Sequence, residues 1–196
     1  EYLKDNYPRE ILEYNEAFKS IPLWITEWNF QMSKTTGNTM LQALFVPSYL
    51  LEILTNPDLN SIELATFHNM AGRTISASML LRKKGEMHVM STYIPMKMIS
   101  NLFRYQNYIS SKEKISNDCF KYIFTDKKKK LIFWVNWSED IVSDRIPNGN
   151  WIKKEYYGAK LYSTTFEKDR INYNRAEIKK EINLKPYSFT MIEEDE

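Results

Sequence analysis

Helical and strand-like patterns of hydrophobic residues alternate along the first seventy residues of the chain. The predicted elements are a helix over residues 8–19, a buried strand over 21–28, a long helix over 40–54 and a second strand over 62–67. Pro8 fits the first turn of the first helix, and Pro47 is expected to kink the long one. Strand, helix and strand in this order predict a parallel α/β unit with a right-handed crossover.

Beyond Gly72 the spacing changes, first to that of a hairpin and then to that of a helix. Apolar residues on both sides of Arg82–Glu86 predict a hairpin or a pair of extended loops. Helical spacing returns over residues 93–108, with Pro95 near the start. We interpret this segment as the last helix of the α/β unit.

The remainder of the chain has the pattern of an all-β fold. Short apolar runs separated by turn residues occur at Phe120–Phe124, Leu131–Trp137, Tyr156, Leu161–Tyr162 and Ile182–Ile192. Several short strands of this kind are typical of a β-sandwich. We therefore predict α/β plus all-β architecture, with an α/β part over residues 1–110 and a β-sandwich over residues 111–196. No low-complexity linker separates the two parts, so we expect them to pack directly together.

Composition indicates a globular protein and does not support a nucleic-acid or membrane partner. Of 196 residues, 43% are hydrophobic and 27% are charged, and the net charge is only +2. The one basic run, Lys127–Lys130, leads directly into an apolar segment, which indicates a solvated hairpin turn. No apolar run approaches the roughly 20 residues of a membrane helix, and no signal peptide opens the chain.

One carboxylate in the first predicted strand is difficult to explain by folding alone. Glu27 lies near the C-terminal end of that strand, among large apolar side chains, where a lone acid costs desolvation unless another group compensates it. In parallel α/β barrels, catalytic groups sit at the C-terminal ends of the strands. Glu27 is therefore the first candidate for a functional residue. The alternative is an exposed Glu at the strand end, with ordinary core residues as neighbours.

Other types of site have little support in the sequence. His68 and His88 are twenty residues apart and have no acid or Cys at ligand spacing, which argues against zinc. Cys119 is the only cysteine, so it forms no intrachain disulfide, and no His lies near it in sequence to activate it. The chain also lacks a Gly-rich phosphate loop and a GxSxG motif. We expect no metal and no cofactor.

Two short stretches carry a resemblance to a known group of enzymes. Trp24-Ile25-Thr26-Glu27-Trp28-Asn29, on a strand followed by a helix, resembles the nucleophile strand of retaining TIM-barrel glycoside hydrolases of the α-L-arabinofuranosidase, β-xylosidase and β-glucuronidase types. The stretch 184–192 is similar to the Leu-Pro-Pro-Tyr-Ser-like segment before the last strand of their C-terminal β-sandwich, with Lys185 in place of one proline. The resemblance implies the C-terminal portion of a (β/α)8 barrel, containing its seventh and eighth strands, followed by a β-sandwich.

The resemblance also implies a function and a set of site residues. Glu27 would be the catalytic nucleophile in the hydrolysis of plant-type or host polysaccharides and oligosaccharides, without a cofactor. The substrate-binding residues, at the same C-terminal end of the strands, would be Trp28, Asn29, His68 and Asn69. The last two have an alternative reading as a packed or turn-forming pair. Trp24 is expected on the side opposite Glu27, packed against helices.

The family's acid/base Glu, which follows an Asn at the end of the fourth strand, has no counterpart in this chain. The resemblance implies that it lies before residue 1, and that the partners are a carbohydrate substrate and an upstream barrel segment or companion chain. A secreted or periplasmic location would be typical of the family. The alternative function is a non-catalytic carbohydrate-binding or interaction module.

Overall fold

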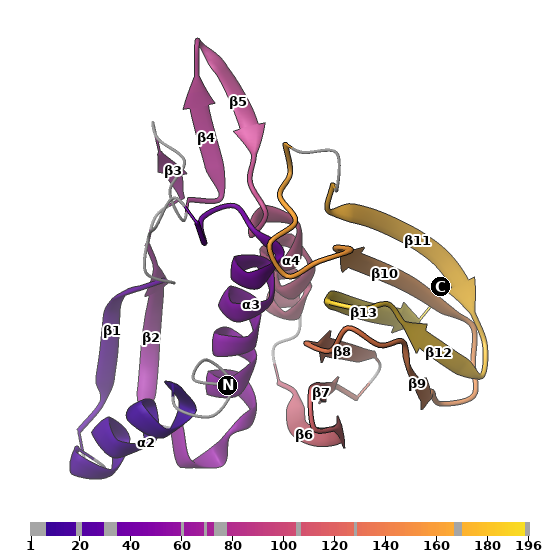
Figure 1. Cartoon of the computed structure of the whole chain (residues 1–196). Helices are drawn as coiled ribbons and strands as arrows, with labels where there is room; N and C mark the ends of the chain where they lie inside the picture. The colour runs from indigo at the N-terminus through magenta and orange to yellow at the C-terminus, as the bar shows by residue number, and fades with distance from the viewer. Residues whose placement is uncertain are drawn as a thin grey trace.

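A single long helix, α3 (Met40–Thr55), lies between two β-sheets in the computed structural model (Figure 1). On one side is a parallel pair of strands, β1 (Leu23–Trp28) and β2 (Ile62–Phe67), and on the other a six-stranded sheet. The structure describes residues 7–18, 21–29, 35–59, 61–68, 70–72, 78–104, 107–127, 129–166 and 170–194.

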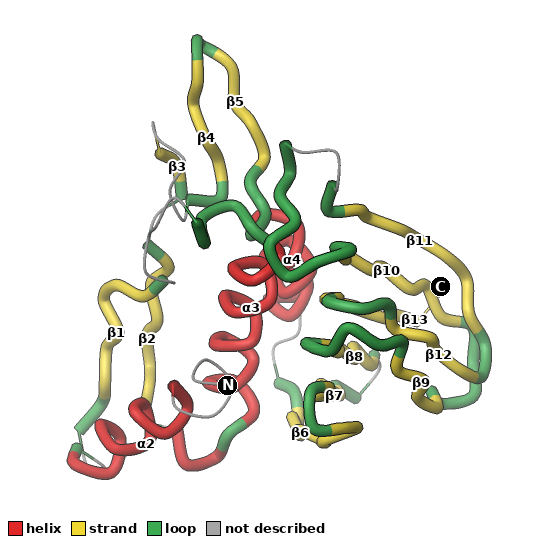
Figure 2. The backbone as a smooth tube through the Cα atoms, in the orientation of Figure 1, coloured by secondary structure: helices red, strands yellow, loops and turns green. Residues whose placement is uncertain are grey.

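The helices in the described residues are α2 (Tyr7–Ala17), α3 and α4 (Tyr93–Ile99), with 3-10 turns η1 (Pro57–Leu59) and η2 (Ser100–Arg104) (Figure 2).

The ends of α3 are defined by capping residues on both sides. Thr39 precedes α3, and its hydroxyl accepts a hydrogen bond from the Gln42 backbone N–H. At the other end the Asn56 N–H donates to the Glu52 carbonyl at 3.0 Å, directly before Pro57. The helix predicted over residues 40–54 is confirmed, and the helix predicted over residues 8–19 is confirmed as far as Ala17, with Lys19 outside the described residues.

The helix predicted over residues 93–108 is shorter in the structure. Its α-helical part ends at Ile99, and residues 100–104 continue as a 3-10 turn. The Ser100 hydroxyl donates to the Lys97 carbonyl at 2.7 Å. Side chains that bond nearby carbonyls compete with the α-helical backbone pattern, so the regular helix ends before the apolar spacing does.

β1 and β2 run parallel, with α3 as their connection. Leu23 pairs with Ile62 at one end and Trp28 with Phe67 at the other, and the register is irregular between Ile25 and Trp28. The predicted parallel strand–helix–strand unit is confirmed. Since α3 returns the chain to the start of β2, the C-terminal ends of both strands lie at the same edge.

A second small sheet stands beyond this edge and projects away from α3 (Figure 1). It contains β3 (Ala71–Gly72), β4 (Leu80–Lys83) and β5 (Glu86–Val89). β4 and β5 form the predicted hairpin, with Lys84 and Gly85 in its turn at φ of 51° and 87°. Positive φ at both central residues is the geometry that two-residue hairpin turns favour.

The six-stranded sheet is entirely antiparallel and has the order β11-β10-β13-β8-β7-β6. Its strands are β6 (Ile109–Ser116), β7 (Cys119–Thr125), β8 (Lys130–Asn136), β10 (Trp151–Tyr157), β11 (Asn172–Ile178) and β13 (Ser188–Glu194). Two further strands, β9 (Val142–Arg145) and β12 (Glu181–Leu184), pair with each other as a separate ribbon. Lys127 and Lys129 lie between β7 and β8, as predicted for a turn, and Lys130 begins β8.

Three features of the strands were not predicted from the hydrophobic pattern. Leu161 and Tyr162 lie in a turn between β10 and β11, because their apolar run is too short to add a strand. β11 carries mostly exposed polar side chains, so hydrophobicity did not reveal it. Glu193, in the acidic run near the end of the chain, belongs to β13 and pairs with Lys154. The chain is thus a mixed helix–sheet structure, and the described strands form no closed barrel.

Side chains on the two faces of the six-stranded sheet alternate between two hydrophobic cores. Phe133 and Val135 of β8 face the core that includes α3 and α4. Ile132 and Trp134 of the same strand face the core beneath the β9–β12 ribbon. Neighbouring residues of β8 therefore serve different cores, as expected for a strand that is buried on both faces.

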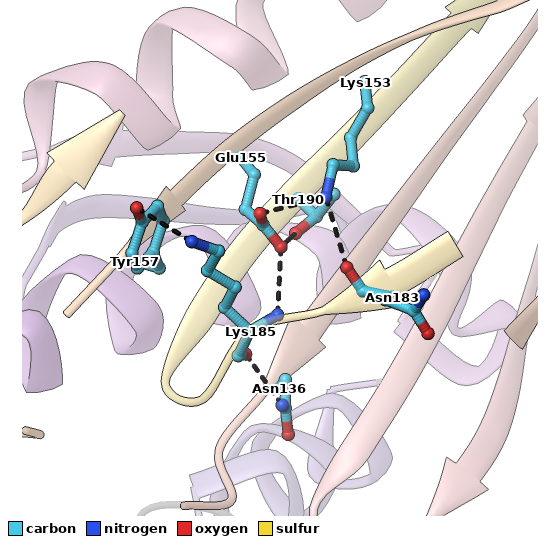
Figure 3. A network of polar contacts seen from close by, with 7 residues as sticks. All are labelled: Asn136, Lys153, Glu155, Tyr157, Asn183, Lys185 and Thr190. Carbon is cyan, nitrogen blue, oxygen red and sulfur yellow. Dashed lines mark hydrogen bonds and ion pairs between the residues drawn. The ribbon is translucent and has the colours of Figure 1, made fainter. Parts of the chain in front are cut away.

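A buried ion pair lies beneath the β9–β12 ribbon (Figure 3). The Lys153 ammonium contacts the Glu155 carboxylate at 3.0 Å and donates to the Asn183 carbonyl of β12 at 3.2 Å. The Glu155 side chain has no exposed surface, and its other oxygen accepts from the Lys185 backbone N–H at 3.0 Å. Thr190 also donates to this oxygen. The carboxylate is thus satisfied on both oxygens, which is the condition for tolerating a buried charge.

The contacts of Lys185 give a physical reason for its presence where the glycoside hydrolases that the sequence resembles have a proline. A proline at this position has no N–H, so it cannot donate to Glu155 as Lys185 does. The Lys185 ammonium also donates to the Tyr157 hydroxyl at 3.0 Å and lies 4.1 Å from the centre of its ring. Lys185 therefore fastens the turn before β13 to β10 through both its backbone and its side chain (Figure 3).

We expect Lys153→Met to destabilise the folded protein by about 3–5 kcal/mol, because it leaves the buried Glu155 carboxylate without its cation. The matched control is Lys154→Met on the same strand, which removes a more exposed ion pair with Glu193 and should cost no more than about 1 kcal/mol. Urea unfolding followed by tryptophan fluorescence measures both losses. Equal losses would contradict a special role for the buried pair.

Candidate functional site

Glu27 reaches the open face of the β1–β2 sheet because β1 is irregular near its end. Strict alternation would put Thr26 and Glu27 on opposite faces, but both are exposed, while Ile25 and Trp28 turn toward α3. The register shift between Ile25 and Trp28 accounts for this. The Glu27 side chain is 74% exposed, so the expected desolvation among large apolar groups is wrong.

His68, directly after β2, is the side chain that meets Glu27. Its Nδ1 lies 3.3 Å from Glu27 Oε1, and 46% of its side chain is exposed. Two further contacts join the same strand ends: the His68 N–H donates to the Trp28 carbonyl at 3.0 Å, and Asn29 Nδ2 donates to the His68 carbonyl. The structure therefore brings Glu27, Asn29 and His68 together at the C-terminal ends of two adjacent parallel strands. Asn69 lies outside the described residues.

Trp28 does not belong to this group, which corrects its assignment to substrate binding. The residue is only 7% exposed, its ring stacks on Tyr49 of α3 at 4.7 Å, and Phe67 meets it edge-on at 5.3 Å. Burial raises the pKa of Tyr49 to about 12, in agreement with an apolar environment. An indole enclosed on both sides has no open face for a sugar, so Trp28 is a core residue.

Trp24 also lies on the side that strand alternation did not predict. It is 66% exposed on the open face, and its Nε1 donates to Glu63 of β2 at 3.4 Å. Leu64 is exposed on the same strand pair. The expectation that Trp24 packs against helices is wrong because it placed Trp24 opposite Glu27 by strict alternation, whereas the bulge puts both residues on the open face. A strictly alternating template has no signal for such a bulge.

Other types of centre find no support in the described part of the chain. No group of three or more His, Cys, Asp or Glu among these residues could hold a metal ion. Cys119 is buried, and burial followed by the nearby Asp144 charge raises the pKa of its thiol to about 12. Such a thiol is a poor nucleophile at neutral pH. Within the described residues, no helix is both long and apolar enough to cross a bilayer.

Comparison with solved structures shows which known proteins have a fold similar to that of this chain. No family model matches the sequence, and no curated protein matches it. A GH51 arabinofuranosidase from Xanthomonas axonopodis pv. citri aligns over 93% of this chain, with a TM-score of 0.64 and 15% identity. The chain has the fold of part of a glycoside hydrolase. It covers only 43% of that arabinofuranosidase.

Two other similar structures extend this glycoside hydrolase likeness. A family 51 α-L-arabinofuranosidase from Bifidobacterium longum aligns over 96% of this chain and 47% of its own, with a TM-score of 0.69 and 11% identity. A GH30 endoxylanase from Clostridium papyrosolvens aligns over 93% and 44%, with a TM-score of 0.57 and 11% identity. This chain therefore spans less than half the length of each of these glycoside hydrolases.

We expect Trp28→Ala to destabilise the protein by about 3–5 kcal/mol, since it removes an indole packed between Tyr49 and Phe67. The control is Glu27→Gln at the adjacent, exposed position, which should change stability by less than about 0.5 kcal/mol. Thermal and urea unfolding of both variants make the comparison. If Trp28→Ala is as stable as Glu27→Gln, Trp28 is not a core residue, and its assignment to substrate binding is supported again.

Proposed function

We propose that this chain is the C-terminal part of a retaining glycoside hydrolase and that Glu27 is the catalytic nucleophile. In this proposal residues 1–110 are the C-terminal portion of a (β/α)8 barrel, and residues 111–196 are a C-terminal β-sandwich. The observation that supports it most is the position of Glu27: an exposed carboxylate at the C-terminal end of a parallel strand, in a fold similar to part of known glycoside hydrolases.

The chemistry requires two carboxylates. In retaining glycosidases they lie about 5–5.5 Å apart, one attacking the anomeric carbon and the other protonating the leaving oxygen. We assign the attack to Glu27 and the proton transfer to a carboxylate outside residues 1–196. Water then attacks the anomeric carbon of the glycosyl ester and gives a proton to the second carboxylate, while the bond from this carbon to Glu27 breaks and Glu27 leaves as a carboxylate. No step of this scheme needs a cofactor.

The open face of the β1–β2 sheet supports the barrel part of the proposal. Large apolar side chains on it, Trp24 and Leu64, are exposed, whereas the opposite face is covered by α3. Two parallel strands alone make a poor sheet, and parallel sheets are normally covered on both faces. We propose that an upstream barrel segment, or a companion chain, adds strands to this sheet and covers Trp24.

One observation favours a second candidate, a non-catalytic carbohydrate-binding or interaction module. Trp24 leaves most of a flat indole accessible, and such a surface can stack on a sugar ring. The two candidates differ in what Glu27 does. The enzyme depends on its carboxylate, whereas the binding module depends on the Trp24 ring and not on Glu27.

In the protein that contains this chain, we expect Glu27→Gln to reduce hydrolysis of an activated aryl glycoside by several orders of magnitude, since the amide keeps the shape of the side chain and cannot act as the nucleophile. The matched control is Glu63→Gln, which alters an acid on the neighbouring strand that contacts Trp24. It should retain activity. Near-normal turnover by Glu27→Gln would show that Glu27 is not the nucleophile and would favour the non-catalytic binding module.

Residues 1–196 alone should not hydrolyse glycosides, because the second carboxylate and most strands of the proposed barrel are missing. The exposed apolar face of β1–β2 should also make the isolated chain prone to association. Size-exclusion chromatography and aryl glycoside assays at several pH values test both expectations. A monomeric, cooperatively folding chain with Glu27-dependent turnover would show that a second carboxylate within it supplies the proton.

A further inference from the structure

The strand ends at the site fix the backbone of His68 on both sides. Its N–H donates to the carbonyl of Trp28, and its own carbonyl accepts from the Asn29 side chain. Both partners belong to the segment that carries Glu27. The backbone that carries the imidazole is therefore tied to the segment that carries Glu27.

The polar partner of the Glu27 carboxylate among the described residues is this imidazole. His68 Nδ1 approaches Oε1 at 3.3 Å, and no other charged group of the described residues lies within the 4.0 Å of an ion pair from either side chain. The nearest acid along β2, Glu63, contacts Trp24 instead. Among the described residues, the ion-pair contact of Glu27 thus involves Oε1 and not Oε2.

We propose that His68 is a positioning residue for the nucleophile and does not bind the sugar, an inference that rests on the proposed function of Glu27. His68 Nδ1 holds Oε1, which limits rotation of an otherwise exposed side chain and directs Oε2 toward the anomeric carbon. Oε2 forms a new bond to this carbon while the glycosidic C–O bond breaks. The bonding pair leaves with the departing oxygen, which takes its proton from the second carboxylate.

Restricting the rotation of a carboxylate affects the reaction rate more when the carboxylate is the nucleophile than when it only binds the sugar. An exposed Glu has several rotamers, and only those that aim Oε2 along the line of attack lead to reaction. A misplacement of about 1 Å can cost about 10²-fold in rate. Loss of the His68 contact should therefore lower kcat more than it raises KM, since substrate binding does not use this contact.

Three replacements of His68 distinguish positioning from sugar binding, because Asn places an amide nitrogen where Nδ1 lies and Gln places one where Nε2 lies. In the protein that contains this chain, we expect His68→Asn to keep kcat within about 3-fold. His68→Gln and His68→Ala should lose about 10²-fold in kcat with little change in KM. Unfolding midpoints close to that of the wild type establish that all three variants are folded.

The outcomes separate the failure of this inference from that of the proposed function. A protein without Glu27-dependent hydrolysis overturns both. If hydrolysis depends on Glu27, the inference alone is overturned by any of three results: no effect of the His68 replacements, rescue by Gln in place of Asn, or a rise in KM at unchanged kcat. The last two results would assign His68 to the sugar through Nε2.

Discussion

Burial of α3 on two opposite sides is the interaction on which the rest of the structure depends. Phe45 and Val46 pack on the β1–β2 side, together with Trp28, whereas Leu44 and Leu51 pack on the six-stranded sheet. Each fully buried side chain of this size contributes about 1.5–3 kcal/mol. Because the helix is apolar all round, neither sheet alone could cover it. The helix therefore fixes the position of β1, and with it Glu27, relative to the antiparallel sheet.

The one charge on α3 that enters this interface is also satisfied. Glu52 is buried and accepts a hydrogen bond from the Tyr122 hydroxyl at 2.6 Å, and Lys112 pairs with the same oxygen. The contact joins the last turns of the helix to β6 and β7. Together with Lys153 and Glu155 on the opposite face, it gives each side of the six-stranded sheet a buried carboxylate that is matched by a lysine.

The β1–β2 sheet is different, because only one of its faces is complete. The face toward α3 is a packed core that contains Trp28, and the open face has Trp24 near its start and Glu27 at its end. A small irregularity in β1 decides this distribution. Without it, Glu27 would point into the core and Trp28 toward the open face. The same bulge thus provides both a well-packed indole and an accessible carboxylate beside His68.

The sequence by itself determined the elements and the candidate carboxylate. Apolar spacing and turn residues are local properties, so they predicted the strand–helix–strand unit, the β4–β5 hairpin and the strands around Phe133. They also directed attention to Glu27 and His68. Only the tertiary structure decided which face each residue occupies. Face depends on register and on what packs against the strand, and one extra residue in β1 put Glu27 on the same open face as Trp24 and turned Trp28 toward α3. The polar edge strand β11 likewise exists because β10 pairs with it, a contact that no local pattern encodes.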